Sequence, residues 1–306
     1  MRRLFYTDQH TIALPPGHKF PISKYSKLRS ALTADGSFEF VPAPLAAREV
    51  IEHVHDVDYV EQFLSGTLPT QVMRRIGFPW SEGLVRRTLA SVGGTLAATR
   101  EALDHSWGGT LAGGTHHAFR AEGSGFCVFN DIAIAIEWLR REQRFERVAV
   151  VDCDVHQGDG TAQIFDGDEG VFTLSLHGRK NFPFRKRRSR LDIELEDGTG
   201  DDDYLAALKP ALDAVFAFRP QFVFFQSGVD PLAVDRLGRL ALTHEGLKRR
   251  DQLVLGTCRE QRVPVAVTLG GGYSDPIEAT VQAHANTFRT AHVIFDEDDF
   301  RLTPSL

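Results

Sequence analysis

Short apolar runs recur along the chain, and each is bounded by Gly, Asp or His. Short runs with such borders are typical of strands that are buried on both faces of a sheet. We predict strands over Val148–Val151, Val171–Leu176, Phe222–Phe225 and Val263–Leu269.

The segments between these runs have helical spacing. Asn130 or Asp131 can cap a helix whose apolar residues then fall on one face. Helices of similar length are predicted over Thr243–Cys258 and Pro276–Ala291. Strands and helices in alternation indicate an α/β fold with a mostly parallel central sheet flanked by helices in three layers. No repeat or linker divides the chain, so we expect one continuous domain over residues 1–306.

Two segments do not follow this pattern. Five prolines in the first 45 residues predict irregular structure that wraps the domain. Further on, the basic run Phe184–Arg190 is followed by the acidic stretch Asp192–Asp203. Neighbouring charge blocks of opposite sign are typical of a solvated loop, and the alternative is a rim that contacts the substrate.

Composition excludes several classes of protein. The 306 residues are 42% hydrophobic and 25% charged, which is ordinary for a globular protein. The net charge of −6 gives no reason to expect direct binding to nucleic acid or to anionic lipid. No apolar stretch has the length of a signal peptide or a membrane span, so we expect no membrane partner.

The cysteines indicate a reducing, cytoplasmic environment. Only Cys127, Cys153 and Cys258 occur, and none forms a CxxC pair. This pattern argues against a disulfide framework and against a zinc site built from cysteines.

The densest polar cluster, VVDCDVHQGDG, follows a predicted strand directly. In an extended chain Asp152, Asp154 and His156 project from one face, because alternate residues share a side. Carboxylates held together at a strand end need a cation to offset their repulsion. Alone, this segment could equally be an ordinary turn rich in Asp and Gly.

A second predicted strand end supplies a further carboxylate. The run Phe222–Phe225 leads to Asp230, which by itself resembles the Asp-Pro start of a turn. In an open α/β sheet, ligands bind beyond the carboxyl ends of the strands. Asp154, His156 and Asp230 would then give three protein ligands with open positions, the number expected of a catalytic zinc site.

Two further motifs carry polar groups suited to acid and base chemistry. The segment GGTHHAF places His116 and His117 after a glycine pair, which permits the turn that both need to face one site. The carboxylates of Asp152 and Asp159 could orient these imidazoles. A glycine-rich turn in VTLGGGYS brings Tyr273 after a strand. Together these groups describe metal-assisted hydrolysis of a carbonyl compound.

These motifs carry a family resemblance. The segments GGTHHAF, SGFCVFND, VVDCDVHQGDG, SGVDPLAVDRLG and VTLGGGYS occur in the order and approximate spacing of the zinc-dependent histone deacetylase family. The chain resembles that family, which implies an arginase-like α/β fold. Flanking stretches such as GFPWSEGLVRRTLASVGGTL and KRRDQLV are most similar to class IV deacetylases and their bacterial relatives.

The resemblance implies a role for each matching residue. Asp154, His156 and Asp230 resemble the zinc ligands, and Asp152 and Asp159 the partners of the paired histidines His116 and His117. Tyr273 resembles the catalytic tyrosine. The implied residues of the substrate tube and its rim are Gly125, Phe126, Phe182 and Leu237. A structural potassium ion is implied at Asp152, Asp154, His156, Ser175 and Leu176.

The resemblance implies a zinc-dependent amidohydrolase that removes acyl groups from lysine ε-amines of a protein or peptide. Fe(II), Mn(II) or Co(II) would suit Asp and His ligands as well as Zn(II). One alternative is a small-molecule amidohydrolase that acts on acetylpolyamines or related metabolites. Another is a non-catalytic interaction protein that a metal stabilises.

Overall fold

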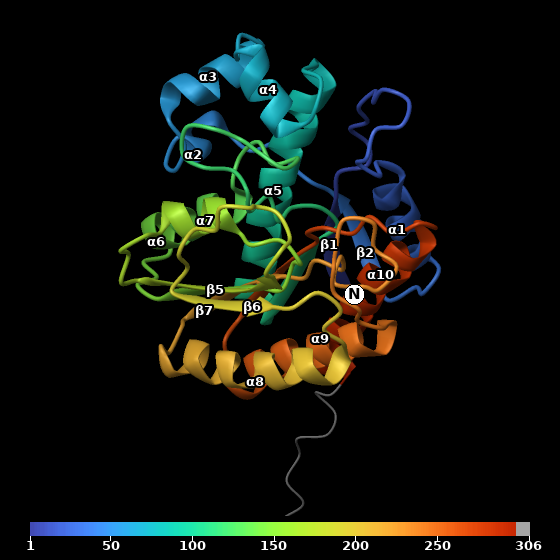
Figure 1. Cartoon of the computed structure of the whole chain (residues 1–306). Coiled ribbons are helices and arrows are strands. Elements are labelled where there is room, and N and C mark those ends of the chain that lie inside the picture. The colour runs from blue at the N-terminus through green and yellow to red at the C-terminus, as the bar shows by residue number, and fades with distance from the viewer. Residues whose placement is uncertain (298–306) are drawn as a thin grey trace, which may run out of the picture.

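The computed structural model describes residues 1–297, which are built around one eight-stranded sheet (Figure 1). The strands lie in the order β2-β1-β3-β8-β7-β4-β5-β6, and every pairing between neighbours is parallel. Their bounds are β1 (Arg2–Tyr6), β2 (Phe38–Pro42), β3 (Trp107–Thr110), β4 (Val148–Asp152), β5 (Val171–Gly178), β6 (Leu191–Leu195), β7 (Phe222–Gln226) and β8 (Val265–Thr268).

Helices cover both faces of this sheet. In Figure 1, α8 and α9 lie below it, and α5, α6 and α7 lie above it. The helical bounds are α1 (Ser23–Thr33), α2 (Arg48–Ile51), α3 (Val57–Ser65), α4 (Thr70–Ile76), α5 (Glu82–His105), α6 (Asp131–Glu142), α7 (Asp159–Ile164), α8 (Asp201–Ala217), α9 (His244–Glu260), α10 (Glu278–His292) and the π-helical turn η1 (Val293–Glu297). None of these helices is both long and apolar enough to cross a bilayer.

The predicted α/β architecture is confirmed at its centre. Every residue of β4 and of β7 is buried, which explains why both read as continuous apolar runs. Asn130 caps α6, since its side chain accepts a hydrogen bond from the backbone N–H of Ala133. The sheet is wholly parallel, where the sequence predicted a mostly parallel one.

Two predictions about the edges of the sheet are wrong. The first 45 residues are not irregular, because they contain β1, α1 and β2. Their prolines fall outside these elements except for Pro42, which ends the edge strand β2, where a missing N–H is tolerated. The acidic stretch after Arg190 is not all loop either. It begins within β6, which closes the opposite edge, and Leu195 of that strand is buried.

The register of the central strands positions the polar residues. Asp152 at the end of β4 lies opposite Ser175 of β5 and Gln226 of β7. Because all three strands are parallel, their carboxyl ends lie at the same end of the sheet. The segments that follow β4 and β7 therefore meet there.

Candidate metal centre and active site

The loops after β4 and β7 bring Asp154, His156 and Asp230 together. Their ligand atoms lie within 4.8 Å of one another. Nδ1 of His156 lies 3.0 Å from Oδ1 of Asp154 and 3.1 Å from Oδ2 of Asp230. Both carboxylates are fully buried, and the imidazole is largely so. The predicted ligand set is thus assembled in space.

Glycines let the carboxylates approach one another. A Cβ atom at Gly271 would lie 1.9 Å from Oδ2 of Asp230, and one at Gly228 would lie 2.3 Å from Oδ2 of Asp154. The backbone N–H of Gly271 also donates to Oδ2 of Asp154 at 2.7 Å. Larger residues at either position would push the carboxylates apart.

The electrostatics of these three groups favour a bound cation. Burial and the charge of Asp154 raise the pKa of Asp230 to about 7. Burial disfavours the charged form of His156, but hydrogen bonds to Asp154 and Asp230 raise its pKa to about 10. A proton on His156 thus balances the buried carboxylates, and a metal ion can take its place. Two oxygens and one nitrogen, all buried, fit a divalent metal such as zinc.

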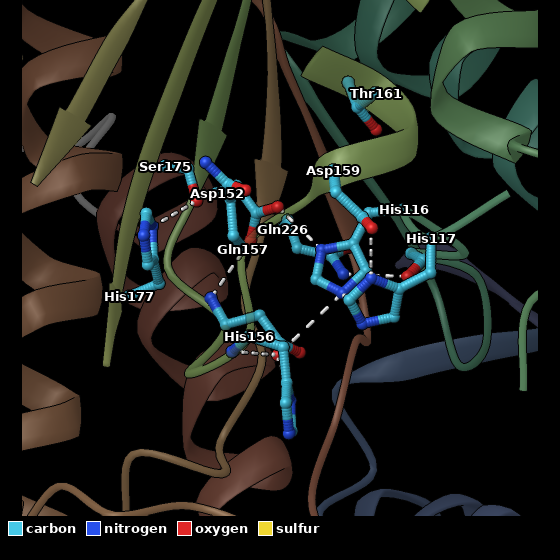
Figure 2. Close-up of polar contacts among 12 residues, drawn as sticks. His116, His117, Asp152, His156, Gln157, Asp159, Thr161, Ser175, His177 and Gln226 are labelled. Carbon is cyan, nitrogen blue, oxygen red and sulfur yellow. Dashed lines mark hydrogen bonds and ion pairs between the residues drawn. The ribbon is translucent and has the colours of Figure 1, made fainter. Parts of the chain in front are cut away.

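Two histidine–aspartate pairs lie beside this cluster (Figure 2). Nδ1 of His116 lies 2.7 Å from Oδ2 of Asp152, and Nδ1 of His117 lies 2.7 Å from Oδ1 of Asp159. The two Nε2 atoms are 3.1 Å apart, so both rings turn the same edge toward one point. All four side chains are buried.

The paired histidines have opposite proton affinities. Burial disfavours a charge on His116, but the nearby carboxylates of Asp152 and Asp154 raise its pKa to about 9. Burial and the charge on His116 lower the pKa of His117 to about 4. His116 is therefore the cationic member, and His117 is the neutral member, whose unprotonated Nε2 faces Nε2 of His116.

The loop that carries both histidines is held by Asp131, at the first turn of α6. Its carboxylate accepts from the backbone N–H groups of Gly114 and Thr115 at 2.9 and 2.7 Å. Gly113 and Gly114 each have φ of +79°, the turn that the sequence required. The sequence pattern predicts Asp131 only as a helix cap, because its contact with residues 16 and 17 positions earlier leaves no mark in that pattern.

Tyr273 reaches the same cavity from the glycine-rich loop after β8. Burial, with the charges of Asp230 and Asp154, raises the pKa of its phenol well above the ordinary value. The hydroxyl therefore remains a hydrogen-bond donor. Asp235 accepts from the backbone N–H of Tyr273 at 2.6 Å, a contact that sequence reasoning did not anticipate.

The four predicted substrate-contacting residues all line one cavity of about 860 Å³, together with His116, His117 and Tyr273. Phe182 packs edge-on against the ring of His117, with 4.9 Å between centroids. A Cβ at Gly125 would lie 2.7 Å from Cδ2 of His117, so glycine permits this close approach. Phe126 has φ of +66°, an uncommon value for a residue with a side chain. Leu237 is the fourth predicted residue that lines the cavity.

The residues predicted to hold potassium lie on β4, β5 and the loop between β4 and α7. Ser175 pairs with Asp152 in the strand register, and Leu176 follows it on β5. Oγ of Ser175 lies 2.9 Å from Nδ1 of His177. Occupancy of this site by potassium stays a prediction.

Comparison of the sequence with known proteins identifies a family and several relatives. The family model described as the histone deacetylase domain matches residues 18–289. An uncharacterized protein of Picosynechococcus sp. is 45% identical over 95% of this chain and 98% of its own. Histone deacetylase 2 of Arabidopsis thaliana is 31% identical over 84% of this chain and 70% of its own.

The fold comparison gives the same architecture. A crystal structure of acetylpolyamine aminohydrolase from Burkholderia pseudomallei superposes with a TM-score of 0.81, and covers 96% of this chain and 99% of its own at 21% identity. This likeness confirms the predicted arginase/deacetylase fold. On the match to the family model and the sequence relatives, the chain belongs to the histone deacetylase family, whose members are metal-dependent hydrolases of acetylated amides.

Proposed function

We propose that this protein is a zinc-dependent amidohydrolase that removes acetyl or longer acyl groups from lysine ε-amines of proteins or peptides. The observation that carries the proposal is the position of the Asp154, His156 and Asp230 cluster. It lies beside two histidine–aspartate pairs, in a cavity whose lining includes the aromatic rings of Phe126 and Phe182. Aromatic walls suit the apolar stem of an acyl-lysine.

Asp154, His156 and Asp230 would hold the metal. When bound there, the ion supplies a Lewis acid that polarises the amide carbonyl and lowers the pKa of water. Because its lowered pKa leaves Nε2 unprotonated, His117 would be able to accept a proton from the attacking water there, while Asp159 holds Nδ1. The same nitrogen then returns the proton to the departing amine.

His116 and Tyr273 would stabilise negative charge. The cationic His116 stays paired with Asp152 and lies next to the point where charge develops. The phenol of Tyr273 would donate a hydrogen bond to the oxygen of the former carbonyl. Such a bond is stronger in the transition state than in the ground state, so it increases the rate.

A small-molecule substrate is the second candidate. It is favoured by the shared fold with a protein named acetylpolyamine aminohydrolase. A relative from Bacillus subtilis, 32% identical over 71% of this chain, is named acetoin utilization protein AcuC.

Hydrolysis of matched substrates distinguishes the two candidates. The zinc-loaded protein is given a fluorogenic lysine peptide series from acetyl to myristoyl, and acetylspermidine in parallel. Turnover of an acyl-lysine peptide is the expected result, and the series shows which acyl length is preferred. Activity confined to acetylspermidine would select the second candidate, and no turnover of either substrate with zinc bound would contradict both.

A further inference from the structure

The mouth of the active-site cavity is cationic. Asp154, one of the proposed metal ligands, is the sole acidic residue among the described residues that line the cavity. Five exposed basic residues line the cavity: Lys19, Arg75, Lys180, Arg236 and Arg239. The whole chain has a net charge of −6, so this positive mouth is a local feature that opposes the overall charge.

Nearby acids neutralise only part of this charge. Glu122 pairs with Arg75 at 2.6 Å, and Asp275 lies 3.8 Å from Arg236. Asp197 is shared between Lys180 at 3.5 Å and Arg239 at 3.2 Å. Three carboxylates thus face five cations, and none of the three lines the cavity. Lys19 has no ion-pair partner within residues 1–297.

The basic run Phe184–Arg190 adjoins the cationic mouth through Phe184. Phe184 is 86% exposed and lines the cavity, and its ring lies 6.4 Å from that of Phe182. Arg185, Arg187 and Arg188, which follow it, are exposed. Neither Arg185 nor Arg188 has an ion-pair partner in the described part of the chain.

This run is held in place beside the metal centre, which favours the rim interpretation over a merely solvated loop. The side-chain amide of Gln157 donates to the carbonyl of Arg187 at 2.6 Å and accepts from its N–H at 2.8 Å. Gln157 directly follows His156. The ammonium of Lys186 points inward and donates to the carbonyls of Asn181 and Pro183.

We infer that the substrate is an acyl-lysine flanked by acidic residues in a peptide or protein segment. This inference rests on the proposed function and names its substrate class. Aspartate or glutamate beside the acyl-lysine would meet the cations of the mouth, which attract anions and repel cations. Acetylspermidine keeps two ammonium groups, so the same mouth would repel it.

Three acetyl-lysine peptides test this inference, with two Asp, two Gln or two Lys residues flanking the same acetyl-lysine. We expect kcat/KM to fall in that order, by about tenfold between the Asp and Lys peptides at low salt. The ratio should shrink toward one at about 1 M salt, where charges are screened beyond roughly 3 Å. Equal or reversed values would overturn the inference.

Charge reversal at the mouth provides a second test. Lys19→Glu with Arg185→Glu, where Arg185 directly follows the lining residue Phe184, breaks no ion pair among the described residues. It should lower kcat/KM for the Asp peptide and raise it for the Lys peptide, whereas a folding defect would lower both. The matched control is Lys209→Glu with Lys248→Glu, two exposed residues on α8 and α9, which cover the lower face of the sheet in Figure 1. The inference fails if both double variants give the same ratio of kcat/KM between the Asp and Lys peptides.

Binding separates this inference from the proposed function. Fluorescence anisotropy measures the affinity of the three peptides for the zinc-loaded protein, and this readout does not depend on hydrolysis. If no peptide is hydrolysed but affinity follows the same charge order, the proposed function fails and the charge inference stands. If all three are hydrolysed at equal rates, the proposed function stands and the charge inference is overturned. Preferred turnover of acetylspermidine would overturn both.

Discussion

Asp235 ties the rim of the cavity to Tyr273. Its Oδ2 accepts from the backbone N–H of Tyr273 at 2.6 Å, while its Oδ1 accepts from those of Leu237 and Gly238 at 2.8 and 2.9 Å. One buried carboxylate therefore holds the proposed oxyanion donor and a rim residue in a common frame. We regard Asp235 as a positioning residue.

Asp235→Asn should lower kcat more than it changes KM. The amide must turn an NH₂ group toward an N–H donor on one side, so one hydrogen bond is lost. We expect about a tenfold decrease in kcat, since a hydrogen bond to a charged group contributes about 1.5 kcal/mol or more. A purely structural role would instead lower the melting temperature with kcat per folded molecule unchanged. Combining the change with Tyr273→Phe should add little further loss if the two act together.

Tyr273→Phe removes the proposed hydrogen bond to the developing oxyanion. We expect kcat to decrease by about two orders of magnitude or more, with metal content and melting temperature unchanged. Steady-state kinetics on the preferred acyl-lysine peptide measures this change. A rate near that of the wild type would remove Tyr273 from the mechanism.

His117→Ala removes the proposed base and acid. Turnover should fall by about two orders of magnitude or more, because proton transfer to and from the reacting groups is lost. His105→Ala is the control, since that imidazole is half-exposed at the end of α5 and lies outside the cavity. Near-wild-type turnover by the His117 variant would show that another group transfers the proton.

Asp230→Ala removes one proposed metal ligand. We expect metal affinity to decrease by at least about 100-fold, as measured by metal analysis after dialysis against a chelator of known affinity. Asp166→Ala, which changes an exposed aspartate away from the site, should keep its metal. A fully metallated Asp230 variant would show that this ligand assignment is wrong.

Burial of His55 should make stability depend on pH. Its Nε2 accepts from the backbone N–H of Asn130 at 2.8 Å, and burial lowers its pKa from 6.5 to about 4. Between pH 6.5 and pH 4, His55 binds a proton in the unfolded chain but stays neutral in the folded chain. The free energy of unfolding therefore decreases as the pH falls from 6.5 toward 4. Between pH 7 and pH 5 this loss is about 2 kcal/mol.

His55→Gln isolates this contribution, because other titrating groups are the same in both proteins. The difference in unfolding free energy between pH 7 and pH 5, from denaturant titrations, should be smaller in the variant by that amount. An identical pH dependence in the two proteins would contradict a neutral buried His55.

Local patterns in the sequence were enough to predict the central strands and the residues at their ends. The alternation of Asp152, Asp154 and His156 after an apolar run depends only on strand geometry, so it could be read without the fold. The double glycine before His116 likewise predicted the turn that brings both histidines to one site. Family resemblance then supplied the expected roles, and the match to the family model confirms the family.

The tertiary structure decided which of these segments meet. Asp230 reaches Asp154 because β7 is the neighbour of β4, although the two residues are 76 positions apart in the sequence. Local sequence patterns also did not predict the contacts of Asp131 and Asp235 with backbone N–H groups. Nor did they predict the edge strands within a segment that is rich in prolines. Periodicity reports only how a residue relates to its near neighbours in sequence. Hydrogen bonds between distant segments and the order of strands arise when the whole chain packs.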